Sequence, residues 1–194
     1  AINGNNFTNK KNTIACIYIV RDPRNLITSL KNHYELDYND ALEFMTNEKK
    51  FIFDYNTQND YSDFQFISSW EKNFLSWKNQ NDFPIKVIRY EDMLDKTYHI
   101  FEDLIYFIND VLKIKEKINK KKLKNSISTT TFEKLKRYEK DYGFSEAISS
   151  KNDKKNIPFF YLGPDNDWKK ILDTKFKEKL NTTFEKNLKY FSYL

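Results

Sequence analysis

The first apolar segment of the chain is a continuous run from Thr13 to Val20. A run that is apolar on both faces is typical of a buried strand in a parallel sheet, covered by helices above and below. Apolar residues then recur at helical spacing from Leu26 to Tyr34, after Asp22 as a candidate N-cap with Pro23 in the first turn. The pattern predicts a strand, a short turn and a helix.

A second unit of the same kind follows. The segment from Pro84 to Tyr90 predicts another strand, and a helix after Asp92 has the clearest helical period of the chain, from Tyr98 to Leu112. Two strand-turn-helix units in succession predict right-handed crossovers and an open parallel sheet. We therefore expect an α/β fold, with residues 1–194 forming a single domain.

The rest of the chain predicts mainly helices. We expect a solvated lysine-rich helix within Lys113 to Lys124, and a long polar loop from Ser145 to Asp167. A loop of this length inside a compact domain is more often functional than idle. Further helices are expected at Asn39 to Phe53, at Phe66 to Trp77, from Thr130 onward and from Thr174 onward.

The composition excludes several classes of protein and of binding site. A net charge of +5, 39% apolar residues and no long apolar run exclude a disordered tail and a membrane segment within these residues. One cysteine and two histidines cannot complete a zinc site, so we expect no metal, and the single cysteine favours a cytoplasmic protein. With three glycines the chain has no Gly-rich phosphate loop of the Walker type. The Lys113 to Lys124 run lacks interleaved aromatics, so we expect no nucleic acid partner.

Arg21 follows the first strand, at the carboxyl edge where open α/β sheets bind ligands. A guanidinium there can hold a phosphate through two hydrogen bonds, and Ser29, two helical turns on, could reach the same anion. The alternative is structural, because Arg21 could simply pair with Asp22. The residues by themselves leave both interpretations open.

The segment from Arg89 to Asp92 lies at the same edge, at the end of the second strand. Polar groups that converge from two strands are typical of a nucleotide site. These residues could equally start a capped helix. Neither His33 nor His99 has an evident Ser or Cys partner, so no catalytic residue is assigned. Some aromatic side chains could stack on an adenine or could belong to the core, namely Phe132, Phe159, Phe160 and Trp168.

Five motifs occur in an order that matches a known family. They are Ile17 to Ser29, Ser69 to Lys72 with Trp77, Arg89 to Asp92, Thr130 to Lys136, and Pro158 to Gly163 with Asp167 to Lys169. The first resembles the 3′-phosphate-binding segment of sulfotransferases that use 3′-phosphoadenylyl sulfate (PAPS), in which a strand ends in Arg and a Ser follows eight residues later. Taken together, the motifs resemble that family from Ile17 to Lys169.

The resemblance implies a P-loop-NTPase-like open parallel sheet flanked by helices, and transfer of a sulfuryl group from PAPS to an acceptor hydroxyl or amine on a small molecule or glycan. PAPS would be the co-substrate, and no metal is needed. The implied cofactor-binding residues are Arg21 and Ser29 for the 3′-phosphate, Tyr90 for the nucleotide, Thr130 and Phe132 beside the adenine, and Phe159 to Gly163 in a loop that closes over the 3′-phosphate.

The sequence departs from the family in two ways. Tyr161 and Leu162 stand where the family usually has Arg-Lys, so Arg24 or a nearby Lys would have to substitute, and Asn166 replaces a glycine. The family's 5′-phosphosulfate loop and its general-base His would lie upstream of Ala1, so we expect a carboxyl-terminal portion that lacks the catalytic base. The alternatives are a P-loop-type small-molecule kinase, or a non-catalytic nucleotide-binding or interaction domain with a sulfotransferase-like fold.

Overall fold

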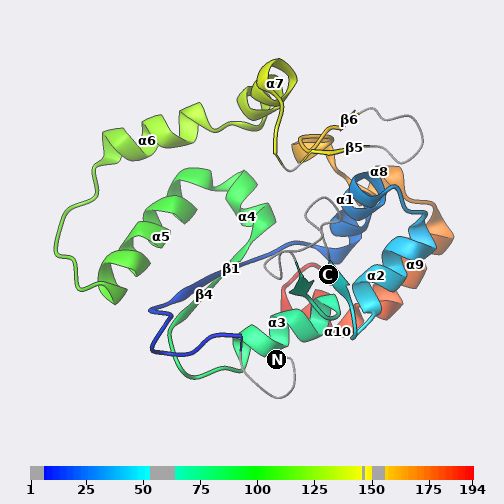
Figure 1. The fold of residues 1–194 in the computed structure, drawn as a ribbon, viewed down its shortest axis with the longest axis horizontal. Helices are drawn as coiled ribbons and strands as arrows, with labels where there is room; N and C mark the ends of the chain where they lie inside the picture. Colours follow the sequence, from blue (N-terminus) through cyan, green and yellow to red (C-terminus); the bar gives the residue numbers. More distant parts are fainter. Residues whose placement is uncertain (1–6, 53–63, 146, 150–155) are drawn as a thin grey trace.

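Two parallel strands lie at the centre of the fold, β1 (Cys16–Val20) and β4 (Ile85–Arg89) (Figure 1). Tyr18 pairs with Val87, and the register continues to Val20 opposite Arg89. Since parallel neighbours cannot be joined by a tight turn, the chain between them forms a crossover that includes three helices. The predicted α/β fold with a parallel sheet flanked by helices is confirmed.

The computed structural model describes residues 7–52, 64–145, 147–149 and 156–194. Besides β1 and β4, the strands are short antiparallel pairs, β2 (Phe51–Ile52) with β3 (Gln65–Phe66) and β5 (Ile148–Ser149) with β6 (Asn156–Ile157). The helices are α1 (Pro23–Tyr34), α2 (Tyr38–Thr46), α3 (Trp70–Lys78), α4 (Tyr90–Asp95), α5 (Thr97–Val111), α6 (Lys120–Thr129), α7 (Phe132–Tyr142), α8 (Trp168–Ile171), α9 (Thr174–Thr183) and α10 (Glu185–Tyr190), with a 3₁₀ turn at Gly163–Asp165.

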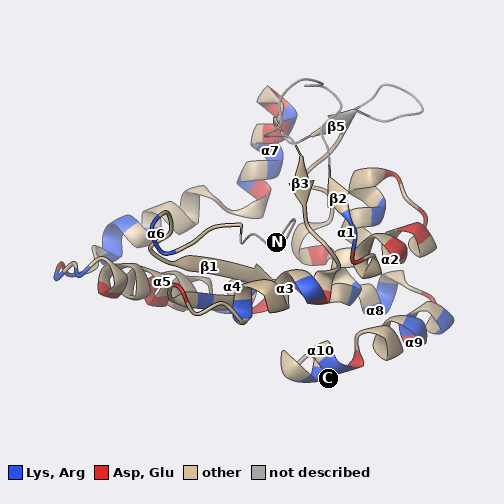
Figure 2. Ribbon diagram, turned by 60° about the horizontal axis from the view of Figure 1, so that its bottom comes forward, with Lys and Arg blue, Asp and Glu red and all other residues tan. Residues whose placement is uncertain are grey.

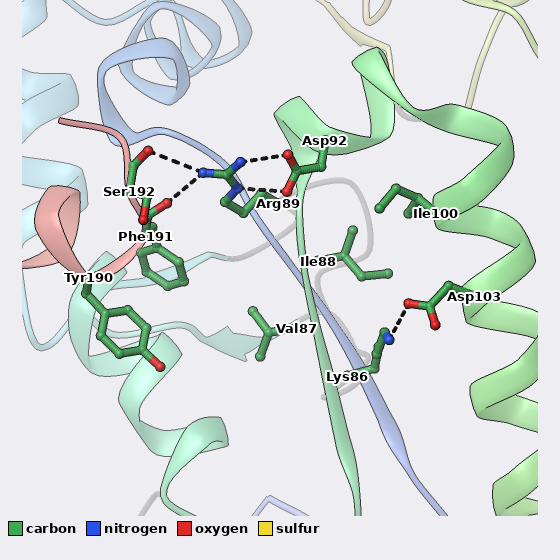
Figure 3. A pocket seen from close by; sticks show the side chains of 10 residues that line it. All are labelled: Lys86, Val87, Ile88, Arg89, Asp92, Ile100, Asp103, Tyr190, Phe191 and Ser192. Carbon is green, nitrogen blue, oxygen red and sulfur yellow. Dashed lines mark hydrogen bonds and ion pairs between the residues drawn. The ribbon is translucent and has the colours of Figure 1, made fainter.

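Both faces of the sheet carry helices. On one face Val20 packs with Phe74 of α3 and with Phe191, which follows α10. On the other, α5 packs against β4, where Ile88 is buried (Figure 3). Coverage is partial, because Ile17 and Ile19 of β1 are 41% and 52% exposed. The larger core cluster lies beyond the sheet, among α1, α2, α9 and α10, with buried residues Ile27, Ala41, Leu42, Met45, Leu172, Leu180, Phe184 and Leu188.

The start of α1 shows how local sequence sets the edge of the sheet. Asp22 is the N-cap, as predicted, and its carboxylate accepts the Arg24 backbone N–H at 2.9 Å, while Pro23 occupies the first turn. The chain therefore turns from β1 into α1 within two residues. This fixes Arg21 at the carboxyl end of the strand.

Several expected boundaries are wrong. The second helix ends at Thr46 and not at Phe53, and Phe66 is in a strand opposite Phe51, because this pair forms a hairpin that helical spacing does not show. The helix expected after Asp92 is α5, and the short helix α4 that precedes it was not expected. The expected last helix breaks at Phe184, where α9 ends and α10 begins.

Charge is spread over the outer helices. Figure 2 shows Lys and Arg along α6 and α7, with Asp and Glu interspersed on the neighbouring helices. The solvated helix expected within Lys113 to Lys124 begins only at Lys120, where Asn119 caps α6, and only Leu123 of this helix is buried. None of the helices in the described part of the chain combines the length and apolar character needed to cross a bilayer.

Candidate functional site

A cleft of about 1050 Å³ opens where β1 and β4 end. Its walls come from α1, from α4 and α5, from α6 and α7, and from the loop of residues 158–164, elements that can be followed in Figure 1. All seven residues that the resemblance assigns to the cofactor line it, namely Arg21, Ser29, Tyr90, Thr130, Phe132, Phe159 and Gly163. Segments far apart in sequence therefore meet at the edge that the strand pattern predicts.

Arg21 reaches from the end of β1 to α1. Its Nη1 donates a hydrogen bond to Ser29 Oγ at 3.1 Å, and its guanidinium carbon lies 4.6 Å from the centre of the Tyr90 ring. Among the described residues, Arg21 Nε is the buried side-chain polar atom that has no hydrogen-bond partner. An unsatisfied buried donor costs about 1–3 kcal/mol, so the contacts that the protein gives Arg21 leave part of its hydrogen-bonding capacity unused.

The pairing of Arg21 with Asp22 is not formed, because the Asp22 carboxylate has another partner. That carboxylate pairs with Arg24, at 2.7 Å between Arg24 Nη2 and Asp22 Oδ2, and the two side chains are only 5% and 6% exposed. Arg24 also donates to Asn181 Oδ1 and to the Tyr193 carbonyl. Because Arg24 is buried and fully paired, it cannot substitute for the missing loop cations.

The electrostatic surroundings of Arg21 are mixed. Burial lowers the pKa of its guanidinium, while nearby Tyr90, Glu91 and Asp22 act in the opposite direction. An arginine pKa remains far above neutral, so the group keeps its charge. Glu91 contacts the same turn directly, since its Oε1 accepts the Asp22 backbone N–H at 3.0 Å and its Oε2 accepts the Tyr193 hydroxyl at 2.8 Å.

The two strand ends do not contribute in the same way. Tyr90 faces the cleft, whereas Arg89 forms a bidentate pair with Asp92 at 2.6 and 2.8 Å and donates to the Phe191 carbonyl. These residues lie instead in a second cavity of about 650 Å³ beside β4, between α5 and residues 190–192 (Figure 3). Its cations, Lys86 and Arg89, are both paired with carboxylates, so it offers no free charge to an anionic ligand.

One face of α7 holds the loop over the cleft. Both Glu139 oxygens accept backbone N–H groups, from Phe159 at 2.6 Å and from Phe160 at 3.0 Å. One turn earlier, Lys136 Nζ donates to the Tyr161 carbonyl at 3.4 Å. Near the start of α7 the Phe132 ring lies against Gly163, where a Cβ would come within 2.3 Å of the ring. The loop conformation is thus set by α7, and only glycine fits at residue 163.

Within the described residues that line the cleft, Arg21 is the only Lys or Arg and no Asp or Glu is present. The lining is otherwise mostly aliphatic and aromatic, including Phe101, Leu123 and Ile127. One cation beside an apolar chamber suits a ligand with an anionic group and a flat apolar ring. Trp168 lies outside this lining, with the Arg24 guanidinium 4.2 Å above its ring.

Two residues at or beneath the cleft were not assigned to it by the sequence reasoning. His33 lines the cleft one turn beyond Ser29, with its ring centre 6.0 Å from that of Phe159. The i, i+4 spacing from Ser29 was a signal that could have placed it there. Asn166 is buried beneath the cleft and hydrogen bonded to Ser29, and its only sequence signal was that it stands in place of a glycine.

The comparisons identify the family of the chain and a similar fold. A family model described as "Sulfotransferase domain" matches residues 6–192, and the chain belongs to that family. No curated protein sequence matches it. The fold is similar to that of mouse sulfotransferase SULT7A1 complexed with PAP, at 22% identity and a TM-score of 0.54 over 89% of this chain.

Retinol dehydratase has a similar fold. Its complex with androsterone and inactive cofactor PAP matches 89% of this chain at 17% identity and a TM-score of 0.51. Its complex with retinol and PAP also matches 89% of this chain, at 18% identity and a TM-score of 0.50. The present chain spans 57% of the length of the mouse sulfotransferase chain and 47% of the retinol dehydratase chains.

Proposed function

We propose that the cleft binds the 3′-phosphoadenosine half of PAPS, and that the protein transfers a sulfuryl group from PAPS to a hydroxyl or amine of a small-molecule acceptor. The observation that carries the proposal is the hydrogen bond between Arg21 Nη1 and Ser29 Oγ in the lining of a mostly apolar cleft. PAPS supplies the sulfuryl group, and its product adenosine 3′,5′-bisphosphate (PAP) shares the part that this chain would hold.

The residues present fit such a ligand. Arg21 lines the cleft and is the only Lys or Arg among the described residues that do so, so it is the group that could pair with a phosphate there. Tyr90, Thr130 and Phe132 line the cleft together and present a polar and aromatic wall to a base. The sulfotransferase family and the PAP complexes of structures with the same fold support the same ligand.

A titration of the 194-residue chain with two ligands tests the proposal. Adenosine 3′,5′-bisphosphate should bind more tightly than adenosine 5′-monophosphate, because only the former has a 3′-phosphate. Replacing Arg21 with Ala should weaken bisphosphate binding by about 2 kcal/mol or more, roughly thirtyfold, and should leave the monophosphate almost unaffected.

Arg137 provides the matched control. It lies on α7, is exposed and does not line the cleft. Arg137→Ala removes the same charge from the protein, so it should leave both affinities unchanged. If Arg21→Ala and Arg137→Ala have equal effects, or if the wild-type chain does not distinguish the two ligands, the assignment of the 3′-phosphate site is wrong.

A further inference from the structure

Asn166 is a buried amide beneath the cleft. It is 6% exposed, follows the 3₁₀ turn at Gly163–Asp165, and does not line the cleft itself. Its Nδ2 donates to the Asn25 carbonyl at 2.9 Å and to Ser29 Oγ at 3.1 Å, while its Oδ1 accepts the Thr28 hydroxyl at 2.5 Å. One side chain thus contacts three residues within the first two turns of α1, and one of them, Ser29, lines the cleft.

The neighbours fix the orientation of this amide. A backbone carbonyl can only accept, so the NH₂ group of Asn166 must face the Asn25 oxygen. An amide turned the other way would place two acceptors against each other. The second hydrogen of the same NH₂ group is then directed to Ser29 Oγ. The serine oxygen is therefore an acceptor in this contact.

Ser29 Oγ accepts from two donors at once. Arg21 Nη1 and Asn166 Nδ2 both lie 3.1 Å from it, and neither group has a lone pair to offer. A hydroxyl has two lone pairs and one proton, so both lone pairs are occupied and the proton needs an acceptor elsewhere. A helical serine often donates to the carbonyl four residues back, which here is Asn25. Asn166 already donates to that carbonyl.

We propose, building on the function proposed above, that Asn166 is a positioning residue that keeps the Ser29 hydroxyl as a hydrogen-bond donor to the 3′-phosphate. Asn166 acts through Ser29 and does not touch the ligand. A phosphate can only accept in such a contact, so a serine whose proton is directed into the cleft is prepared for it. A glycine at residue 166 would remove one of the two donors to Ser29 Oγ. It would also remove one of the donors to the Asn25 carbonyl, which also accepts the Thr28 hydroxyl at 2.7 Å.

The test uses the same two ligands and a double-mutant cycle. Asn166→Ala should weaken the binding of adenosine 3′,5′-bisphosphate about three- to tenfold and should leave the affinity for adenosine 5′-monophosphate unchanged. In a Ser29→Ala background the same substitution should have no further effect, because there is no hydroxyl left to orient. Asn166→Asp should weaken the binding of the bisphosphate further, because a carboxylate would accept the hydrogen bond of the Ser29 hydroxyl and would repel the phosphate.

Asn187→Ala is the control for a general loss of packing. Asn187 is 9% exposed and its amide faces Glu71, away from the cleft. This variant should melt at a lower temperature without any change in the preference for the bisphosphate. The proposal fails if Asn166→Ala weakens the binding of both ligands equally, or if its effect persists in the Ser29→Ala background. A wild-type chain with no preference for the bisphosphate would overturn the proposed function itself, and this inference with it.

Discussion

Tyr193 donates its hydroxyl proton to Glu91 at 2.8 Å and thereby joins the segment after α10 to the first turn of α4. The other Glu91 oxygen accepts the backbone N–H of Asp22, beside Arg21. Burial and the hydrogen bond to Glu91 raise the pKa of Tyr193 far above its usual value, so the phenol stays a donor wherever the protein is folded. The ends of both central strands are in this way connected to the C-terminal segment.

Removing that hydroxyl should destabilise the fold. In Tyr193→Phe the Glu91 carboxylate loses one donor in a partly buried site, and we expect a loss of about 1–2 kcal/mol in the free energy of unfolding. Urea denaturation measures it. Tyr190→Phe is the control, since this side chain is 57% exposed, and it should change the free energy of unfolding very little. Equal losses in the two variants would show that the contact with Glu91 does not stabilise the protein.

The buried pair of Asp22 and Arg24 should be sensitive to the loss of either member. Arg24→Ala leaves the Asp22 carboxylate buried without its cation, and the expected cost is about 3–5 kcal/mol. Replacing both residues, as Asp22→Asn with Arg24→Met, should recover part of that loss because no charge is then left unpaired. Chemical denaturation of the three proteins gives the comparison.

An exposed ion pair provides the contrast. Asp110 and Lys113 lie 3.5 Å apart with side chains 83% and 81% exposed. Asp110→Ala should therefore be almost neutral in the same denaturation assay. If Arg24→Ala lowers the free energy of unfolding as little as Asp110→Ala does, burial does not make the Asp22–Arg24 pair important for stability. It would also reopen the possibility that Asp22 serves Arg21.

The parts of the fold that could be predicted are those in which sequence neighbours decide the structure. The run from Thr13 to Val20 is apolar on both faces, which is typical of a strand covered by helices even though the cover here is partial, and Asp22 caps a helix through a backbone N–H two residues away. The same pattern predicts the second strand, Pro84 to Tyr90, which is one residue too long at each end. Local signals also place Arg21 at the end of the first strand and Ser29 within reach of the same anion.

What could not be predicted depends on residues distant in sequence. Whether Asp22 pairs with Arg21 or Arg24 is decided by Asn181 and Tyr193, which hold the Arg24 guanidinium and are more than 150 residues away. The hairpin of Phe51 with Phe66 likewise forms between segments that each carry an apolar pattern compatible with a helix. The periodicity of apolar residues does not identify partners that are distant in the same chain, and these partners set the helix and strand boundaries that the prediction missed.

Acid should weaken the fold in part through Asp92. The hydrogen bond from Arg89 lowers the pKa of the Asp92 carboxyl below its ordinary value of about 3.9. Because the folded pKa lies below the unfolded one, this contribution to stability is complete above about pH 4 and is lost as the pH falls through the folded pKa. Asp92→Asn should be less stable at neutral pH and should lose less stability on acidification. Urea midpoints between about pH 3 and about pH 7 measure both effects.

The close contact of Gly163 with Phe132 gives the last prediction. Gly163 has a φ of +54°, and a Cβ there would lie 2.3 Å from the ring. Gly163→Ala must therefore displace either the loop of residues 158–164 or the Phe132 ring, and both line the cleft. We expect weaker binding of adenosine 3′,5′-bisphosphate as well as a lower free energy of unfolding.

Gly143 separates backbone strain from the steric clash. It ends α7 with a φ of +78°, but no atom lies within 4 Å of the position of its Cβ. Gly143→Ala should therefore cost about 1–3 kcal/mol of stability from backbone strain alone, because φ +78° with ψ 174° is a region essentially confined to glycine, with no change in nucleotide affinity. Gly163→Ala adds the clash with Phe132, so its loss of stability should be accompanied by weaker binding. If the two variants lose the same stability and bind the nucleotide equally well, the ring of Phe132 moves away freely, and the loop does not depend on this contact for its position.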